Sequence, residues 1–351
     1  MRSTTRTAPR HVVGALVAGL ALTMAACAPG GEESPVDEDL DQVTLLTNFR
    51  IVFAHYADLY GAVEEGIFAE HGVDMLVQPG QTSADTVAQV AAGTAQFGIV
   101  DPVSGMVAIE QGAEVTFVAS RFQSYTGSVC WSEPENAVES WSDLVGKSIG
   151  GATGDAFVTA LPLLMEQNGV DPDIEVITLD SNAQQGALIS GQIDLVPTNA
   201  VGLADKELGL AEHGKDIGCF RFAEHGAALP GFAMLVNNDL IESDPDLVQR
   251  VVDAYAEAVL WGLEHPEPAV DAFMDAFPDR DREAVELDFG YSEAFLDSVA
   301  TDPELGVFAL VPEYMDGAAE LAALKYDSEI AAEDTYTNRF VEEVPTELRN
   351  P

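Results

Sequence analysis

The chain has 351 residues, enough for about two domains of ordinary size. Its 60 Asp and Glu residues against 15 Lys and Arg residues give a formal net charge of −45. This charge excludes a surface that neutralises nucleic-acid phosphates and a basic surface that binds anionic lipid. The acidity fits either adaptation to a saline medium, where salt screens like-charge repulsion, or an acidic exported protein of no special habitat.

The N-terminus has the pattern of an export signal. Three arginines within residues 1–10 precede an apolar run at 11–23, which is too short to span a bilayer but suits a signal peptide ending at residue 26. Met24-Ala-Ala-Cys27 then resembles a bacterial lipobox, although Met24 stands where Leu is usual. We therefore expect a lipid anchor at Cys27 on the extracytoplasmic face of the membrane; ordinary cleavage with an unmodified cysteine is the alternative. Residues 27–41, rich in Pro, Gly and acids, predict a flexible tether.

Beyond the tether, short apolar runs alternate with helical patterns that end at glycines. This alternation predicts parallel α/β sheets. The expected strands are 43–46, 73–77, 97–100, 115–120, 127–131, 148–150, 174–179, 193–197, 219–222 and 233–236. The expected helices are 56–65, 83–93, 103–111, 155–168, 182–190, 245–264, 267–276, 282–288 and 313–324.

Four motifs follow one another along this pattern, and each is weak by itself. Together they resemble substrate-binding proteins of ABC importers, in the subgroup that captures thiamine precursors, sulfonates, nitrate and related molecules. The resemblance covers about residues 43–325. The motifs are Leu59-Tyr60-Gly-Ala62 with the following Gly66-x-Phe68-x3-Gly72, Gln96-Phe-Gly-Ile-Val-Asp101, Asp143-Leu-Val-Gly-Lys-Ser-Ile-Gly150 and Ala187-Leu-x-x-Gly191-Gln-x-Asp194.

The resemblance implies an α/β clamshell of the periplasmic-binding-protein type 2 fold, with a mixed sheet flanked by helices in each lobe. Residues 42–121 plus 226–325 would form the first lobe, 122–225 the second, and 326–351 a C-terminal extension. A small-molecule ligand would bind between the lobes, at the carboxyl ends of strands. The expected protein is a monomer whose partner is an ABC permease.

Candidate ligand contacts follow the predicted strands. The loop after the first strand offers Asn48, Phe49, Arg50 and Tyr56, without the Trp-x-Pro-Asn pattern usual in thiamine-precursor binders. Arg50 would clamp an anionic group or form a surface salt bridge, and His55 is better explained as an ordinary polar residue.

The remaining candidates lie at later strand ends and at the first crossing between lobes. Asp101 and Ser104 would hold a polar group or merely cap a helix. At the crossing, Arg121 would support an anionic ligand group, whereas Tyr125 would stack on a flat ligand or pack between the lobes. The other candidates are Thr153 and Gly154, whose loop amides suit a polar group, Asp155, which suits an amine or caps a helix, and Asn199.

Cys130 and Cys219 are placed for a disulfide, since each begins a strand near a crossing of an exported chain. No metal site, cofactor motif or catalytic nucleophile is recognisable, so we expect a binding protein and not an enzyme. The aromatic residues near the cleft and the excess acid favour a heteroaromatic, thiamine-precursor-like ligand over sulfonate, nitrate or another small anion. An enzyme of precursor biosynthesis on the same fold and a ligand-sensing adaptor remain open alternatives.

Overall fold

The computed structural model describes residues 40–49, 53–151, 156–199, 201–298 and 306–349. The expected signal peptide and lipidated Cys27 lie outside these residues, as do Arg50, Thr153, Gly154 and Asp155. Within the described part of the chain, no helix combines the length and the apolar character needed to cross a bilayer.

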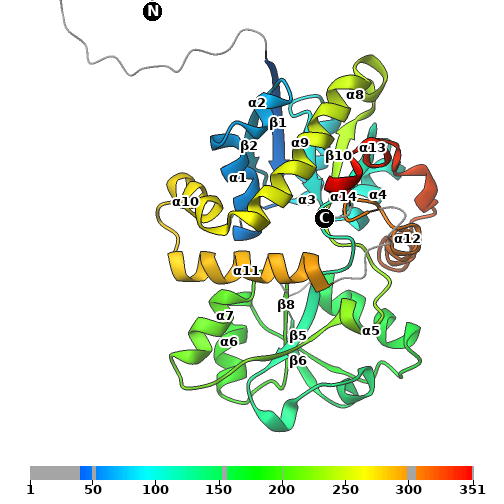
Figure 1. Ribbon diagram of the computed structural model, residues 1–351. Helices are drawn as coiled ribbons and strands as arrows, with labels where there is room; N and C mark the ends of the chain where they lie inside the picture. The colour runs from blue at the N-terminus through cyan, green and yellow to red at the C-terminus, as the bar shows by residue number, and fades with distance from the viewer. Residues whose placement is uncertain (1–39, 50–52, 152–155, 200, 299–305, 350–351) are drawn as a thin grey trace, which may run out of the picture. The chain divides into compact units, whose positions relative to one another are not determined.

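The first lobe is built on a five-stranded mixed sheet with the strand order β2-β1-β3-β10-β4 (Figure 1). β1 pairs in parallel with β2 and β3, whereas β10 runs antiparallel to β3 and β4. β10 joins this sheet only after the chain has built the second lobe, so the backbone crosses between the lobes twice. The strands are β1 (Asp41–Thr47), β2 (Val73–Pro79), β3 (Phe97–Val100), β4 (Val115–Ser120) and β10 (Ala233–Asn237).

Helices flank this sheet because its inner strands β3 and β10 are buried on both faces. All of β3 and β10 is buried. Gly66 and Gly72 have φ values of +82° and +73°, a conformation that favours glycine, and each ends a short helix as expected. The helices of the first lobe are α1 (Ala57–Glu64), α2 (Ile67–Glu70), α3 (Ser83–Ala91), α4 (Pro102–Glu110), α8 (Asn238–Ser243), α9 (Pro245–Glu264), α10 (Pro266–Ala276) and α12 (Pro312–Tyr326), preceded by the 3₁₀ turn η1 (Ala54–Tyr56).

The second lobe holds two small sheets. β5 is the central strand of an antiparallel sheet of order β8-β5-β9, and β6 pairs in parallel with β7. A bridge between Ile149 and Leu195 links the two sheets. The strands are β5 (Gly127–Trp131), β6 (Ser148–Gly151), β7 (Glu175–Thr178), β8 (Val196–Asn199) and β9 (Gly218–Arg221), and the helices are α5 (Ala156–Gln167), α6 (Ser181–Ile189) and α7 (Ala204–Ala211).

Three expectations need correction. β1 begins at Asp41, so the tether does not extend through that residue. The helix expected at 282–288 continues to Ser298 as α11 (Arg282–Ser298), and α7 was not anticipated. The expected C-terminal extension is part of the first lobe, because Tyr336 bridges to Phe117 of β4 and the side chains of α13 (Arg339–Glu343) enter the core. The last helix is α14 (Thr346–Arg349).

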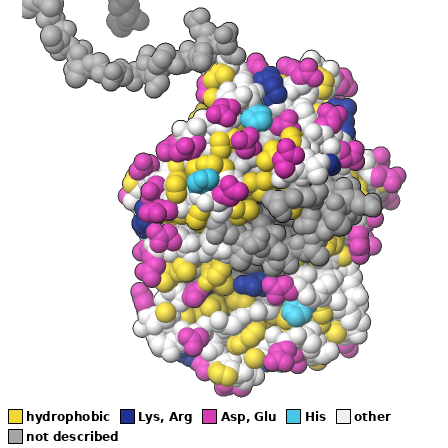
Figure 2. All heavy atoms as spheres, viewed as in Figure 1, with side chains coloured by type: hydrophobic (Ala, Val, Ile, Leu, Met, Phe, Trp, Pro, Cys, Tyr) yellow, Lys and Arg dark blue, Asp and Glu magenta, His cyan; other side chains and the backbone are white. Residues whose placement is uncertain are grey.

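Acidic side chains are scattered over the face shown in Figure 2, with few Lys or Arg side chains among them. Several cations are nevertheless paired with acids: Arg250 with Asp41, and Arg282 with both Asp271 and Glu286.

Candidate functional site

Five rings gather where the two crossings meet the loop after β1. His55 lies between Phe53 and Phe232, with ring centroids 5.9 Å from each and interplanar angles of 13° and 18°. Phe49 meets Phe53 edge to face at 5.3 Å, and Phe122 of the first crossing lies 5.6 Å from His55. We call these five residues the aromatic cluster. It combines one loop with both crossings, so it lies where the lobes join.

Two buried polar groups at this cluster lack protein partners. His55 is 1% exposed, and neither ring nitrogen has a hydrogen-bond partner among the described residues. The side-chain amide nitrogen of buried Asn48 also lacks a hydrogen-bond partner among the described residues, whereas its Oδ1 accepts a hydrogen bond from Tyr56 Oη at 3.1 Å. Burial, assisted by Arg121, lowers the pKa of His55 well below its usual value. The neutral imidazole therefore offers one donor and one acceptor.

The second lobe closes over this cluster. Gly202 faces the ring of Phe53, since a Cβ at position 202 would lie 3.6 Å from that ring. Val201 belongs to the same hydrophobic core as the first-lobe strands. Asn199 is half-buried at the end of β8 and accepts a hydrogen bond from the Val201 amide at 3.1 Å. Asn199 thus shapes the loop that reaches the first lobe.

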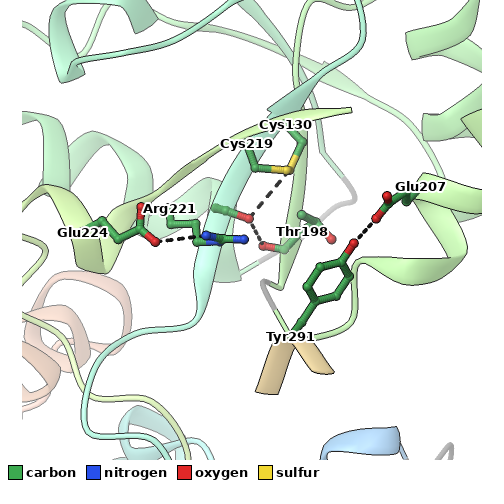
Figure 3. The surroundings of a disulfide bond; sticks show 8 residues. Cys130, Thr198, Glu207, Cys219, Arg221, Glu224 and Tyr291 are labelled. Carbon is green, nitrogen blue, oxygen red and sulfur yellow. Dashed lines mark hydrogen bonds and ion pairs between the residues drawn. A yellow bond between two sulfur atoms is a disulfide. The ribbon is translucent and has the colours of Figure 1, made fainter. Parts of the chain in front are cut away.

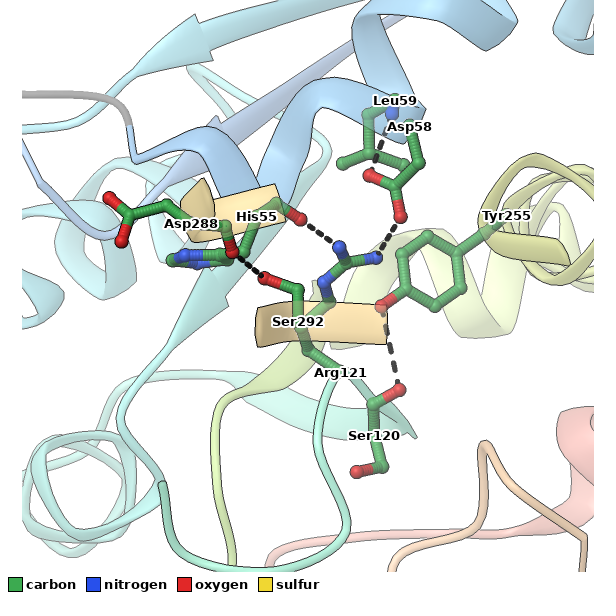
Figure 4. A network of polar contacts seen from close by, with 8 residues as sticks. All are labelled: His55, Asp58, Leu59, Ser120, Arg121, Tyr255, Asp288 and Ser292. Carbon is green, nitrogen blue, oxygen red and sulfur yellow. Dashed lines mark hydrogen bonds and ion pairs between the residues drawn. The ribbon is translucent and has the colours of Figure 1, made fainter. Parts of the chain in front are cut away.

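Arg121, expected to support an anionic ligand group, is instead committed to a buried ion pair (Figure 4). It is 1% exposed, its Nη1 lies 2.7 Å from Asp58 Oδ2, and its Nη2 donates to the carbonyl of His55. Burial lowers the pKa of Arg121, but the charge and hydrogen bond of Asp58, together with Tyr255 and Tyr56, raise it by a larger amount, so the guanidinium stays charged. The positive charge is neutralised inside the first lobe, so we do not retain Arg121 as a ligand contact. Tyr56, 1% exposed beside it, is likewise internal.

A separate pocket brings together three of the residues selected from the sequence. Asp101 and Ser104 at the start of α4 line it with Tyr125 of the first crossing, and its cavity volume is about 50 Å³. Leu229 and Pro230 of the second crossing form another wall, and Lys325 and Tyr326 from the end of α12 complete it. This volume is well below the roughly 300–1,000 Å³ of typical small-molecule pockets.

The carboxyl of Asp101 caps helix α4 and also lines this pocket. Its Oδ1 accepts a hydrogen bond from the Ser104 amide at 2.9 Å and so caps α4. Burial raises the pKa of Asp101, while the contacts with Ser104 and the charge of Lys325 oppose this rise. Helix capping, one of the two expected roles, is therefore real, and it does not remove Asp101 from the pocket wall.

Helix α11 connects the lobes beside the aromatic cluster. It contacts η1 in the first lobe and α7 in the second. Its Asp288 Oδ1 accepts a hydrogen bond from the Ala204 amide at 2.9 Å, and Tyr291 Oη donates to Glu207 of α7. Burial, together with the charge of Asp205, raises the pKa of Asp288 to about 6. The backbone amides of Leu203 and Ala204 and the charge of Arg280 oppose this shift.

We expect Asp288→Asn to weaken the pH dependence of folding stability. Because the native pKa of Asp288 lies above its unfolded value, the native state binds more protons than the unfolded chain between about pH 4 and 6, so stability falls as pH rises through that window. Asn keeps the acceptor but does not titrate. From pH 4.5 to 7.5 the wild type should lose about 2 kcal/mol more than the variant, using 1.36 kcal/mol per pKa unit.

Urea unfolding of both proteins at the two pH values measures this difference. Asp271→Asn, at an exposed carboxyl, is the matched control and should leave the pH dependence unchanged. Parallel pH dependences for the wild type and Asp288→Asn would contradict the prediction.

The two cysteines of the second lobe are joined by a disulfide (Figure 3). They face each other on β5 and β9, where the strand register pairs Cys130 with Cys219. The bond therefore ties the central strand of the β8-β5-β9 sheet to its edge.

The sequence pattern of the NMT1/THI5-like family matches residues 54–269, which is more than half of the chain. The chain belongs to the NMT1/THI5-like family. Its matched segment contains Asp101, Tyr125 and both crossings, whereas Lys325 lies beyond it.

This NMT1/THI5-like protein resembles proteins that are named for different functions. It is 24% identical to the formylaminopyrimidine-binding protein of Halalkalibacterium halodurans over 241 residues, 68% of this chain and 71% of that protein. It is 23% identical to the 4-amino-5-hydroxymethyl-2-methylpyrimidine phosphate synthase of Aspergillus parasiticus over 274 residues, 75% of this chain and 80% of that one. The structure of the periplasmic aliphatic sulphonate binding protein SsuA of Escherichia coli superposes with a TM-score of 0.63 at 11% identity, covering 84% of this chain and 91% of that chain.

The fold is therefore that of periplasmic binding proteins, as expected. The residues that sequence reasoning missed are Lys325 and Tyr326 of the pocket and the rings Phe53, Phe122 and Phe232. The pocket pair lies more than 200 residues beyond Asp101, and no local pattern connects them. The sequence favours an ordinary polar role for His55, yet its position beside aromatic residues in a strand-end loop is the signal that could have identified it.

Proposed function

We propose that this protein is an extracytoplasmic solute-binding lipoprotein of an ABC importer, anchored through Cys27. It captures a small heteroaromatic molecule where its lobes join and delivers it to a membrane permease. Family membership supports the binding role, since one relative is a formylaminopyrimidine-binding protein. The protein acts as a monomer and does not bind nucleic acid.

The observation that carries this proposal is the aromatic cluster with its unpartnered buried polar groups. A buried polar atom without a hydrogen bond costs about 1–3 kcal/mol, so His55 and Asn48 are poised for a partner from outside the protein. A nitrogen heterocycle supplies donors and acceptors in one plane and an aromatic face for the surrounding rings. These two requirements together favour a heteroaromatic ligand over nitrate or an aliphatic sulfonate.

The ligand contacts that we propose come from both lobes. Asn48, Phe49 and His55 belong to the loop after β1, and Asp101, Ser104 and Tyr125 to the pocket beside α12. From the second lobe we retain Asn199 as a proposed contact. We also retain four residues that lie outside the described part of the chain: Arg50, Thr153, Gly154 and Asp155.

One observation favours a second candidate, an enzyme on the same fold. A relative of 23% identity is named as a pyrimidine phosphate synthase. A neutral buried imidazole is also a usable acid or base. Prolonged incubation with each bound ligand, followed by mass spectrometry, separates the two: unchanged ligand supports binding and transport, whereas product supports the enzyme.

We expect substituted aminopyrimidines to raise the melting temperature of the protein by several degrees at millimolar concentration, because a ligand that binds only the native state stabilises it. His55→Phe keeps an aromatic ring at this position but removes both nitrogens. The variant should bind at least about tenfold more weakly, corresponding to one lost hydrogen bond of about 1.4 kcal/mol. Thermal shift and calorimetric titration measure the two effects.

His265→Phe is the matched control, because His265 stacks on Trp261 at the end of α9, away from the crossings. This variant should bind like the wild type. The proposal fails if no pyrimidine, flavin or related heterocycle stabilises the wild type, or if His55→Phe binds them with unchanged affinity.

A further inference from the structure

Helix α11 belongs to the packing of both lobes. Val285 and Phe289, one turn apart, are buried in the core that contains the first-lobe strands. Asp288 and Tyr291 occupy the neighbouring face of the helix. Asp288 reaches the start of α7, and the ring of Tyr291 packs against the second-lobe cluster that contains Leu203. A single helix is therefore anchored in the first lobe by one face and in the second lobe by the next.

The first turn of α7 takes its N-terminal cap from α11. The first amides of a helix have no partner within the helix, and a polar side chain at the N-cap position usually supplies one. In α7 that position holds Leu203, whose side chain makes no capping hydrogen bond. Instead, Asp288 Oδ1 accepts from the Ala204 amide at 2.9 Å, across 84 positions of the sequence. The second lobe thus depends on the first for this buried hydrogen bond.

The capped turn continues the loop that reaches the aromatic cluster. β8 ends at Asn199, and the short loop after it leads directly into α7. In this loop Gly202 faces the ring of Phe53. Helix α11 also contacts η1, the turn that contains His55. It therefore touches the second-lobe loop through the cap and the first-lobe segment that carries the imidazole.

Tyr291 adds a second polar contact between α11 and α7 (Figure 3). Its Oη donates to the carboxylate of Glu207, three residues after Ala204. Both contacts join polar groups whose protein partners could be replaced by water if the lobes moved apart. Such a polar seam suits a joint between lobes that opens and closes.

We infer that Asp288 and Tyr291 are positioning residues that hold the loop after β8 against the aromatic cluster, so that α11 acts as a clasp that slows ligand escape. The inference rests on the proposed function, because it concerns retention of the same ligand. Neither side chain is assigned a contact with that ligand. A contact made only while the lobes are together stabilises the enclosed state, so its loss accelerates dissociation and leaves association unchanged.

Stopped-flow kinetics with 4-amino-2-methylpyrimidine test the clasp. We expect Asp288→Ala to release this compound about fivefold faster than the wild type, as for the loss of one helix cap, at an unchanged association rate. Tyr291→Phe keeps the ring but loses the hydroxyl, and should have a smaller effect in the same direction. Asp288→Asn keeps the acceptor and should restore the wild-type dissociation rate. Glu286→Ala, which removes an exposed carboxylate from the same helix, is the matched control.

X-ray scattering from the ligand-free proteins gives a second test that does not depend on binding. The double variant Asp288→Ala, Tyr291→Phe should have a larger radius of gyration than the wild type, whereas Glu286→Ala should scatter like the wild type. The inference is overturned if the double variant scatters like the wild type, if Asp288→Ala releases the compound at the wild-type rate, or if Asp288→Asn fails to restore that rate.

The two tests also separate this inference from the proposed function. If His55→Phe weakens binding but Asp288→Ala and the wild type release the compound equally fast, the proposed function stands and the clasp fails. If no heterocycle binds to the wild type, the proposed function fails, and scattering alone decides whether α11 holds the lobes together.

Discussion

Replacing Asp58 by alanine is expected to lower the free energy of unfolding by about 3–5 kcal/mol, because the change leaves the charge of Arg121 buried without a partner. Asp58 and Arg121 are 2% and 1% exposed, so bulk solvent does not reach the guanidinium that the substitution leaves without its carboxylate. Tyr56 and Phe122 lie beside the guanidinium at 5.5 and 5.4 Å from its central carbon, and their rings cannot neutralise it fully. Urea unfolding at pH 7 measures the loss.

Two controls separate the buried charge from other effects of the substitution. The double variant Asp58→Leu with Arg121→Met removes both charges and should recover most of the stability, since apolar replacements of buried pairs are often neutral. Asp271→Ala makes the same chemical change at an exposed ion pair with Arg282 and should leave stability close to wild type. An Asp58→Ala variant as stable as Asp271→Ala would show that the pair contributes nothing.

The pair also positions the candidate site. Arg121 donates to the carbonyl of His55, and the Arg121 and Phe122 amides share the carbonyl of Phe232 at 2.7 and 3.2 Å. The side chain of Arg121 therefore ties the loop after β1 to helix α1, and its backbone amide ties the first crossing to the second. This arrangement fixes the imidazole of His55 relative to the rings on either side of it.

The fold was largely predictable because its signals are local. Short apolar runs such as 97–100 and 233–236 became buried strands, and glycines such as Gly72 ended helices where expected. Helix α7 was missed because its sequence, ADKELGLA, has only two buried residues and no clear apolar face. The C-terminal residues were misjudged because their apolar side chains are few and widely spaced, so their burial depends on a sheet formed elsewhere.

The site was less predictable because it depends on tertiary contacts. Asp101, Ser104 and Tyr125 were found through strand ends and the crossing, and the structure places all three in one pocket. The prediction that Arg121 contacts the ligand was wrong because arginine side chains are usually exposed. Only its buried partner Asp58, 63 positions earlier in the sequence, explains why Arg121 is buried. Lys325 was missed for the same reason, since α12 reaches the pocket from the end of the chain.

Removing the disulfide is the second change with a large expected effect. The double variant Cys130→Ala, Cys219→Ala should lower the free energy of unfolding of the second lobe by about 4 kcal/mol, because the bond closes a long loop of the unfolded chain, with a sequence separation of 89 residues. The bond also joins β5 to the edge strand β9, so its loss affects the sheet that carries Asn199 on β8.

Tryptophan fluorescence during urea unfolding is a suitable measurement, since Trp131 and Trp141 both pack in the core of the second lobe. Wild type treated with a strong reductant should unfold like the double variant, whereas the same reductant should leave the double variant unchanged. This comparison separates the covalent bond from the small loss of packing caused by the alanines. If oxidised wild type, reduced wild type and the double variant unfold at the same urea concentration, the two strands are held by their hydrogen bonds and packing alone.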